Sequence, residues 1–68
     1  MDNKYIIFSV LIECEENGIK RYDSTTLSDY MNGQSEEQCW EQTRIFCEEA
    51  GKKFNAKWIL CGSHIVTF

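Results

Sequence analysis

The sequence feature that most constrains the fold is an alternating apolar stretch near the start of the chain, from Lys4 to Glu15. The odd positions of this stretch begin apolar and end acidic, whereas the even positions are apolar throughout. The even positions are Ile6, Phe8, Val10, Ile12 and Cys14. A period of two with β-branched and aromatic residues predicts a strand with one fully buried face. The fold must therefore contain a sheet with a cover over one side.

A hairpin is predicted directly after this strand. Asn17-Gly18 supplies the positive φ angles that a tight turn requires, and residues 19–27 follow as a second strand. A three-residue loop with Gly18 as a bulge would set Glu13 opposite Arg21, whereas a two-residue loop would set Cys14 opposite Arg21. The first register pairs opposite charges, so we predict the three-residue loop.

Residues 35–51 predict an amphipathic helix after a loop at 28–34. Ser35 is a favourable N-cap, Gln38 can complete a capping box, and Gly51 is a suitable C-cap residue. At about 100° per residue one apolar face is formed. Its members are Cys39, Trp40, Thr43, Phe46, Cys47 and Ala50.

The remaining segment, residues 56–68, predicts a second hairpin with Gly62-Ser63 as a two-residue turn and Cys61 opposite His64. The fold class is therefore α+β. We expect one domain, residues 1–68, with the order β-β-α-β-β: a four-stranded antiparallel sheet with one helix packed on one face.

One helix covers one face of such a sheet, yet several strands are apolar on both faces. The residues expected beneath the helix from the last hairpin are Ile59, Cys61, Val66 and Phe68. Those expected on the open face are Trp58, Leu60, Ile65, Tyr5, Ile7 and Leu11. An uncovered patch of this size indicates an interaction surface. Alternatively, the 28–34 loop, with Tyr30 and Met31, folds over it.

Metal binding and catalysis find little support in the residue pattern. Cys61 and His64 could offer one ligand pair, but Cys39 and Cys47 are about 12 Å apart along a helix and cannot share an ion. The adjacent glutamate pairs lie at a turn and on a solvated helix rather than in a cleft. We therefore expect no enzyme, cofactor or metal, and a zinc-stabilised domain stays as a further alternative.

The charge balance disfavours nucleic acid as the main partner. The chain has 11 acidic and 7 basic residues, a net charge of −4, and phosphate binding needs a basic surface. A small nucleic-acid-binding domain is nevertheless the second hypothesis. Its candidate residues are Lys20, Arg21, Lys52, Lys53 and Lys57.

Protein binding is the leading hypothesis. The longest apolar run is eight residues with a serine inside it, well short of the roughly 20 that a membrane-spanning helix requires, and we expect a cytoplasmic protein. The partner is either a larger protein or a second copy held through the open sheet face. The candidate contact residues are Glu37, Glu41, Ile45, Glu48, Trp58, Leu60 and Ile65.

In these features the chain resembles small phage-encoded proteins that inhibit bacterial defence machinery, the anti-CRISPR type among them. The shared features are a short acidic chain, one sheet with one helix, and the lack of a catalytic motif. The resemblance implies a non-enzymatic inhibitor that occludes a functional site on a larger host defence protein or complex in the host cytoplasm. No motif is shared, so the resemblance assigns no residue.

Overall fold

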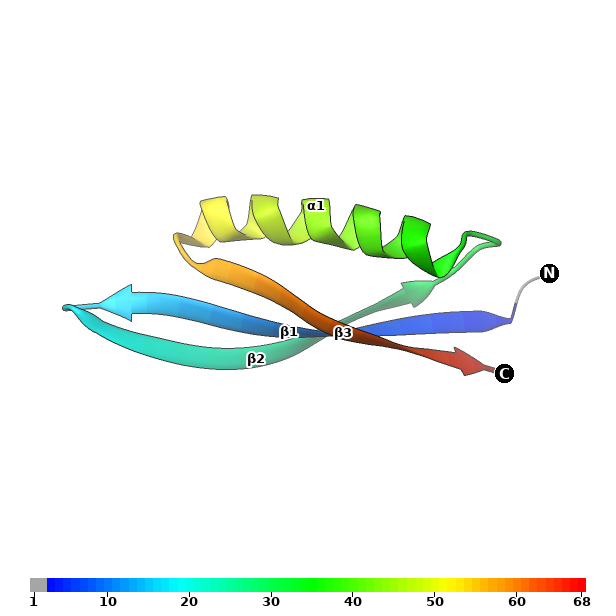
Figure 1. Cartoon of the computed structure of the whole chain (residues 1–68), viewed down its shortest axis with the longest axis horizontal. Helices are drawn as coiled ribbons and strands as arrows, with labels where there is room; N and C mark the ends of the chain where they lie inside the picture. Colours follow the sequence, from blue (N-terminus) through cyan, green and yellow to red (C-terminus); the bar gives the residue numbers. More distant parts are fainter. Residues whose placement is uncertain (1–2) are drawn as a thin grey trace.

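The computed structural model of the chain describes residues 3–68, which form one three-stranded antiparallel sheet with one helix on one face (Figure 1). The elements, in chain order, are β1 (Lys4–Glu16), β2 (Ile19–Tyr30), α1 (Glu36–Phe54) and β3 (Lys57–Thr67). The strand order in the sheet is β2-β1-β3. The α+β class is confirmed, whereas the fourth strand and the β-β-α-β-β order are not found within residues 3–68. The molecule is long and narrow, 49 × 18 × 14 Å.

The β1–β2 hairpin closes through a two-residue turn, so the predicted three-residue loop was wrong. Asn17 and Gly18 both have positive φ, 54° and 78°. Two successive residues of this kind form a turn whose twist matches the strands. Cys14 therefore lies opposite Arg21.

β2 is longer than expected and takes up the start of the predicted 28–34 loop. It runs without a register shift to Tyr30, which lies opposite Tyr5. The next residue, Met31, donates its N–H to the Lys4 carbonyl at 3.0 Å and buries its side chain with Cys39 beneath α1. This loop therefore packs on the helix side and does not cover the open face.

β3 is one continuous strand, so the predicted Gly62-Ser63 turn was wrong. Gly62 lies opposite Ser9 on β1, and pairing continues along β1 on both sides of this point. The only irregularity that the β1–β3 register shows is a bulge, because Val10 lies opposite Leu60 and leaves Cys61 as an extra residue. A full-length partner strand offers backbone hydrogen bonds to residues that a hairpin would have used in a turn.

The helix begins as predicted and ends later. Ser35 accepts from the Gln38 N–H at 3.1 Å, and the Gln38 side chain accepts from the Ser35 N–H at 2.9 Å, which completes the capping box. Gly51 is not the C-cap, because α1 continues to Phe54 and Asn55 takes the left-handed conformation with φ of 52°.

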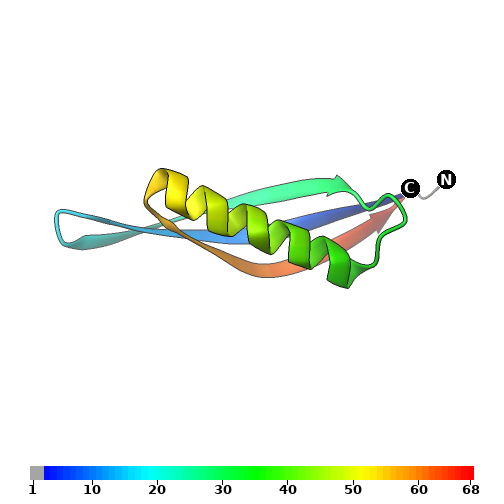
Figure 2. The same cartoon turned by 90° about the horizontal axis from the view of Figure 1, so that it is seen from above.

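The core is a thin layer between α1 and the sheet. Its buried side chains are Ile6, Phe8, Val10, Met31, Cys39, Cys47 and Ala50. Trp40 packs edge-on against Phe8, with ring centroids 5.7 Å apart, and its Nε1 donates to Ser63 Oγ at 2.8 Å. Ser63 in turn donates to Glu36 Oε2 at 2.9 Å. These contacts fix α1 obliquely across the strands, over β1 and β3 (Figure 2).

Candidate interaction surface

The sheet face opposite α1 is uncovered by any element between residues 3 and 68 (Figure 1). Because directly paired residues of antiparallel strands point to the same side, the register assigns this face. Its large apolar members are Tyr5, Ile7, Leu11, Ile59, Val66, Tyr22 and Tyr30. The side chains on β1 are half-buried by their neighbours, and those near the strand ends are more exposed. We call this set the open face.

An aromatic cluster marks the end of the open face where the chain termini lie. The rings of Tyr5 and Tyr30 meet edge-on at 4.9 Å, and the Phe68 ring lies 6.0 Å from Tyr30. Tyr30 and Phe68 remain 54% and 64% exposed. The Tyr5 hydroxyl is hydrogen-bonded to Ser28 Oγ at 3.2 Å, which fixes its ring. Such ordered, half-exposed aromatic side chains are the type enriched at protein interfaces.

The pairing of β3 with β1 reverses part of the expected face assignment. Of the predicted open-face residues, Tyr5, Ile7 and Leu11 lie there, as the register confirms. Trp58, Leu60 and Ile65 lie instead on the helix side: they pair with Ile12, Val10 and Ile6 of β1. These three share one face, as predicted, because the extra residue Cys61 restores the alternation between Leu60 and Ile65. Their predicted placement was wrong because pairing with the even-numbered residues of β1 puts that face beneath α1.

The side chains of β3 that replace them on the open face are Ile59, His64 and Val66, opposite Leu11, Ile7 and Tyr5. Ile59 and Val66 were expected beneath the helix, and that expectation was also wrong. Trp58 packs between Phe46 and Phe54 of α1, with ring centroids at 6.4 and 6.3 Å. Its Nε1 is buried and has no hydrogen-bond partner among the described residues.

The helix residues predicted to contact a partner, Glu37, Glu41, Ile45 and Glu48, are exposed and form what we call the helix ridge, whose acidic charge is partly neutralised by Arg44. Arg44 lies between Glu41 and Glu48, with N–O distances of 2.5 and 3.0 Å, and these two carboxylates raise its pKa. Glu37 is exposed in the first turn, and Ile45 is 46% exposed beside the ion pairs. Exposed ion pairs of this kind are screened by solvent and contribute little stability.

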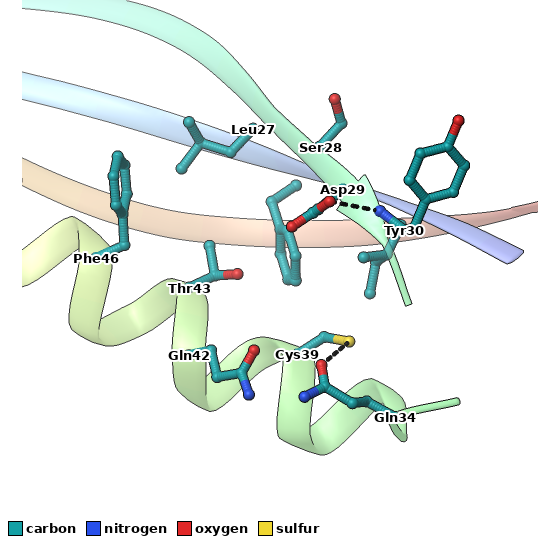
Figure 3. Close-up of a pocket in the computed structure, with 11 residues that line it drawn as sticks. Leu27, Ser28, Asp29, Tyr30, Gln34, Cys39, Gln42, Thr43 and Phe46 are labelled. Atoms are coloured by element: carbon teal, nitrogen blue, oxygen red, sulfur yellow. Dashed lines mark hydrogen bonds between the residues drawn. The ribbon is translucent and has the colours of Figure 1, made fainter. Parts of the chain in front are cut away.

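A groove of about 300 Å³ runs between α1 and the helix side of β2 (Figure 3). Its apolar lining includes Phe8, Leu27 and Phe46, and its polar lining includes Asp29 and Gln42. Phe46 was predicted in the core and is 51% exposed. Sequence reasoning missed this α1–β2 groove because the groove arises from the position of α1 over β3 and β1, which leaves β2 uncovered.

The basic residues of the nucleic-acid hypothesis do not form one free patch. Lys20 pairs with Glu13 at 3.2 Å, a contact that raises the lysine pKa, and Arg21 pairs with Glu16 at 2.7 Å. The predicted pairing of Glu13 with Arg21 is not observed; each basic side chain pairs instead with a glutamate that lies diagonally across the hairpin. The remaining three, Lys52, Lys53 and Lys57, are exposed near the end of α1 and the start of β3.

The cysteines and the histidine are dispersed. Cys61 is the exposed bulge residue and His64 lies on the open face, so the two do not face each other across a turn. Burial raises the pKa of the Cys39 and Cys47 thiols, and Asp29 and Glu36 add to the rise at Cys39. Within residues 3–68 no three His, Cys, Asp or Glu side chains are grouped closely enough to hold a metal ion.

Comparisons with protein families, curated proteins and solved structures returned no match for this chain. No helix in the part of the chain that the structure describes is long and apolar enough to cross a membrane.

Proposed function

We propose that the protein is a non-enzymatic binding module that attaches to a larger protein through the open face of its sheet. The observation that carries this proposal is the uncovered apolar row at the centre of that face, formed by Ile7 and Leu11 of β1 and Ile59 of β3. These three side chains are half-buried by their neighbours in the sheet, and no element of residues 3–68 covers them. Apolar faces of this kind on small domains mark interaction surfaces.

The chemistry of the open face indicates the kind of partner surface it fits. Aromatic side chains surround one end of the apolar row, and serine and threonine side chains line its β2 side, among them Ser24 and Thr26 opposite Leu11 and Ser9. An apolar centre with a polar rim is the usual anatomy of a protein–protein interface. We propose a partner with an apolar protrusion, and by the resemblance to anti-CRISPR proteins this partner is a host defence protein whose functional site becomes occluded.

The exposed helix ridge offers a second contact surface. Its charge is partly neutralised by Arg44, whereas Ile45 is exposed between the ion pairs. Because the ridge and the open face lie on opposite sides of the molecule, one flat partner surface cannot contact both. A single flat partner therefore contacts either the open face or the helix ridge, and mutations on each surface distinguish these two cases.

The test combines partner capture with matched variants. The tagged chain is expressed in bacteria that carry an intact phage-defence system, the captured protein is purified, and its affinity is measured for three chains: wild type, Ile7→Lys and Glu41→Lys. We expect Ile7→Lys to weaken binding at least about tenfold, because it places a charge in a desolvated interface centre. Glu41→Lys changes only the helix ridge and is expected to leave affinity unchanged.

Phage plating on the same bacteria tests the type of target. We expect the wild-type chain to raise plaque numbers, and Ile7→Lys to remove the effect while circular dichroism shows an intact fold. Unchanged plaque numbers would contradict the anti-defence assignment. Loss of binding with Glu41→Lys and not with Ile7→Lys would move the contact surface to the helix, and the lack of any saturable partner would refute the binding module itself.

A further inference from the structure

The outer edge of β2 is long and unpaired within residues 3–68, because β2 is the terminal strand in the order β2-β1-β3. It has 12 residues and no proline. Met31 directs its N–H to β1, and the register has no shift, so alternate residues of β2 direct their backbone groups outward. The outward residues are Lys20, Tyr22, Ser24, Thr26, Ser28 and Tyr30. An edge of this length is a template for another strand.

Two acidic side chains already occupy some of the outward hydrogen-bond donors of this edge. Asp23 Oδ1 accepts from the Ser24 N–H and Asp29 Oδ1 accepts from the Tyr30 N–H, each at 2.8 Å. The carboxylates occupy donors that an incoming strand would need. When an incoming strand takes one of these N–H groups, the displaced carboxylate loses its hydrogen bond. A cationic side chain is the strongest replacement partner, because it forms a charge-assisted hydrogen bond with the carboxylate.

We propose that this edge pairs with β2 of a second copy of the chain, antiparallel about a two-fold axis at Thr25. A two-fold axis through such a strand pair stands perpendicular to the sheet, so both helices lie on the same side and residues pair with residues on their own face. With Thr25 at the centre, Arg21 lies opposite Asp29 of the second copy. By symmetry the same ion pair forms again at the other end of the interface.

Charge selects this register over its neighbours. When the axis moves to Ser24, Arg21 lies opposite Leu27 and Asp29 loses its cation. When it moves to Thr26, Asp23 lies opposite Asp29 and two like charges meet. The Thr25 register alone among the three gives each Asp29 an arginine. It also places Lys20 opposite Tyr30 of the second copy on the open face, where a cation can approach an aromatic ring.

The helix does not obstruct the approach of a second copy. α1 packs over β3 and β1, and β2 is exposed along its length except at Thr25 and Leu27, which are half-buried (Figure 2). Asp29 lines one end of the α1–β2 groove, so the pairing brings Arg21 of the second copy to that end of the groove. The dimer would have a continuous six-stranded sheet whose two open faces lie side by side.

The dimer thus doubles the proposed binding surface, but it rests on the edge of β2 and not on the open face. Failure of the dimer would therefore leave the proposed partner binding through the open face intact, and the two proposals are tested by different experiments. Sedimentation equilibrium over a range of protein and salt concentrations is expected to show a monomer–dimer equilibrium that weakens as salt is added, because the ion pairs are partly exposed.

Two charge reversals and their mixture test the register. Arg21→Glu places a carboxylate opposite Asp29 at both ends of the homodimer, and Asp29→Arg places two arginines opposite each other at both ends. Each variant alone is expected to raise the dimer dissociation constant about tenfold or more. When the two variants are mixed, both pairs of facing side chains are again of opposite charge, and a heterodimer is expected with an affinity within about threefold of the wild-type dimer.

Matched controls separate local pairing from net charge. Lys52→Glu and Glu49→Arg, both exposed on α1, make the same charge changes away from the β2 edge, and neither should alter the dimer dissociation constant. Ile7→Lys on the open face should also leave it unchanged. The proposal is overturned by a monomer at every concentration up to the solubility limit, by homodimers of the single variants as tight as wild type, or by an equimolar mixture that stays monomeric. Loss of the dimer with Ile7→Lys would place the interface on the open face and overturn it too.

Discussion

Position 51, inside α1, accommodates only glycine, because a side chain there would collide with the backbone that follows the helix. A Cβ built there lies 2.6 Å from the Ala56 carbonyl oxygen, closer than real Cβ contacts occur. The Ala56 backbone cannot move away easily, since its own N–H donates to the Gly51 carbonyl at 2.9 Å and the preceding Asn55 is in the left-handed conformation. Gly51→Ala is therefore expected to destabilise the protein although it adds a better helix former.

The magnitude follows from two opposing effects. Alanine in place of glycine inside a helix contributes about 1 kcal/mol of stability. Overpacking against a fixed neighbour costs about 1–3 kcal/mol, and a contact with backbone lies at the upper part of that range. The net expected loss for Gly51→Ala is about 1–2 kcal/mol, the difference between these two effects. For a chain of this size each kcal/mol lowers the melting temperature by about 4–8 °C.

Urea denaturation followed by far-ultraviolet circular dichroism measures the change in the free energy of unfolding. Gly62→Ala on β3 is the matched control, because a Cβ at Gly62 meets no atom within 4 Å. There we expect no loss, and a gain of up to about 1 kcal/mol from reduced freedom of the unfolded chain. A Gly51→Ala variant as stable as wild type, or more stable, would refute the close approach of Ala56 to the helix.

Further predictions concern the core, the helix start and the thiols. Phe8→Ala empties the centre of the thin core and should cost about 3–5 kcal/mol, enough to leave little folded protein by circular dichroism at 25 °C. Ser35→Ala removes the N-cap and should cost about 1 kcal/mol in urea denaturation, whereas Ser35→Asp should retain most of the stability. Because Cys39 and Cys47 have raised pKa values when folded, unfolded thiols lose their protons first, and the free energy of unfolding should fall as pH rises above the ordinary thiol value of about 8.5. Iodoacetamide at pH 8 should alkylate Cys61 well before these two buried thiols, and equal rates by mass spectrometry would contradict their burial.

The sequence predicted those elements whose signals are local. The alternation in β1 identified its buried face, and Ile6, Phe8 and Val10 are buried there. The prediction of a fully buried face was wrong at the hairpin end, where Ile12 and Cys14 are half-buried. Ser35 and Gln38 identified the first turn of the helix, because a capping box needs only residues three apart. The exposed charged side of α1 followed from its 3.6-residue period in the same way.

The prediction was wrong at two positions where local signals permit two structures, the β1–β2 hairpin loop and the end of the helix. Asn17-Gly18 permits both a two-residue and a three-residue loop, and charge matching favoured the wrong one because side chains as long as Lys20 and Arg21 also pair diagonally. Gly51 and Asn55 are both suitable C-cap residues, and the helix ends at the second. Local chemistry permitted each choice, and the packing around it selected one.

The alternation of β1, the capping box of α1 and the α+β class were thus determined by the sequence itself, since each depends on interactions between residues a few positions apart. Tertiary structure decided the course of β3. A long partner strand keeps Gly62 extended, and its register turns Trp58 and Leu60 inward beneath α1 and Ile59 and Val66 outward. The bulge at Cys61 keeps the residues on its two sides in step with the faces of β1. The composition of the open face and the free edge of β2 depend on this pairing between strands more than 40 residues apart in the chain, which no local pattern encodes.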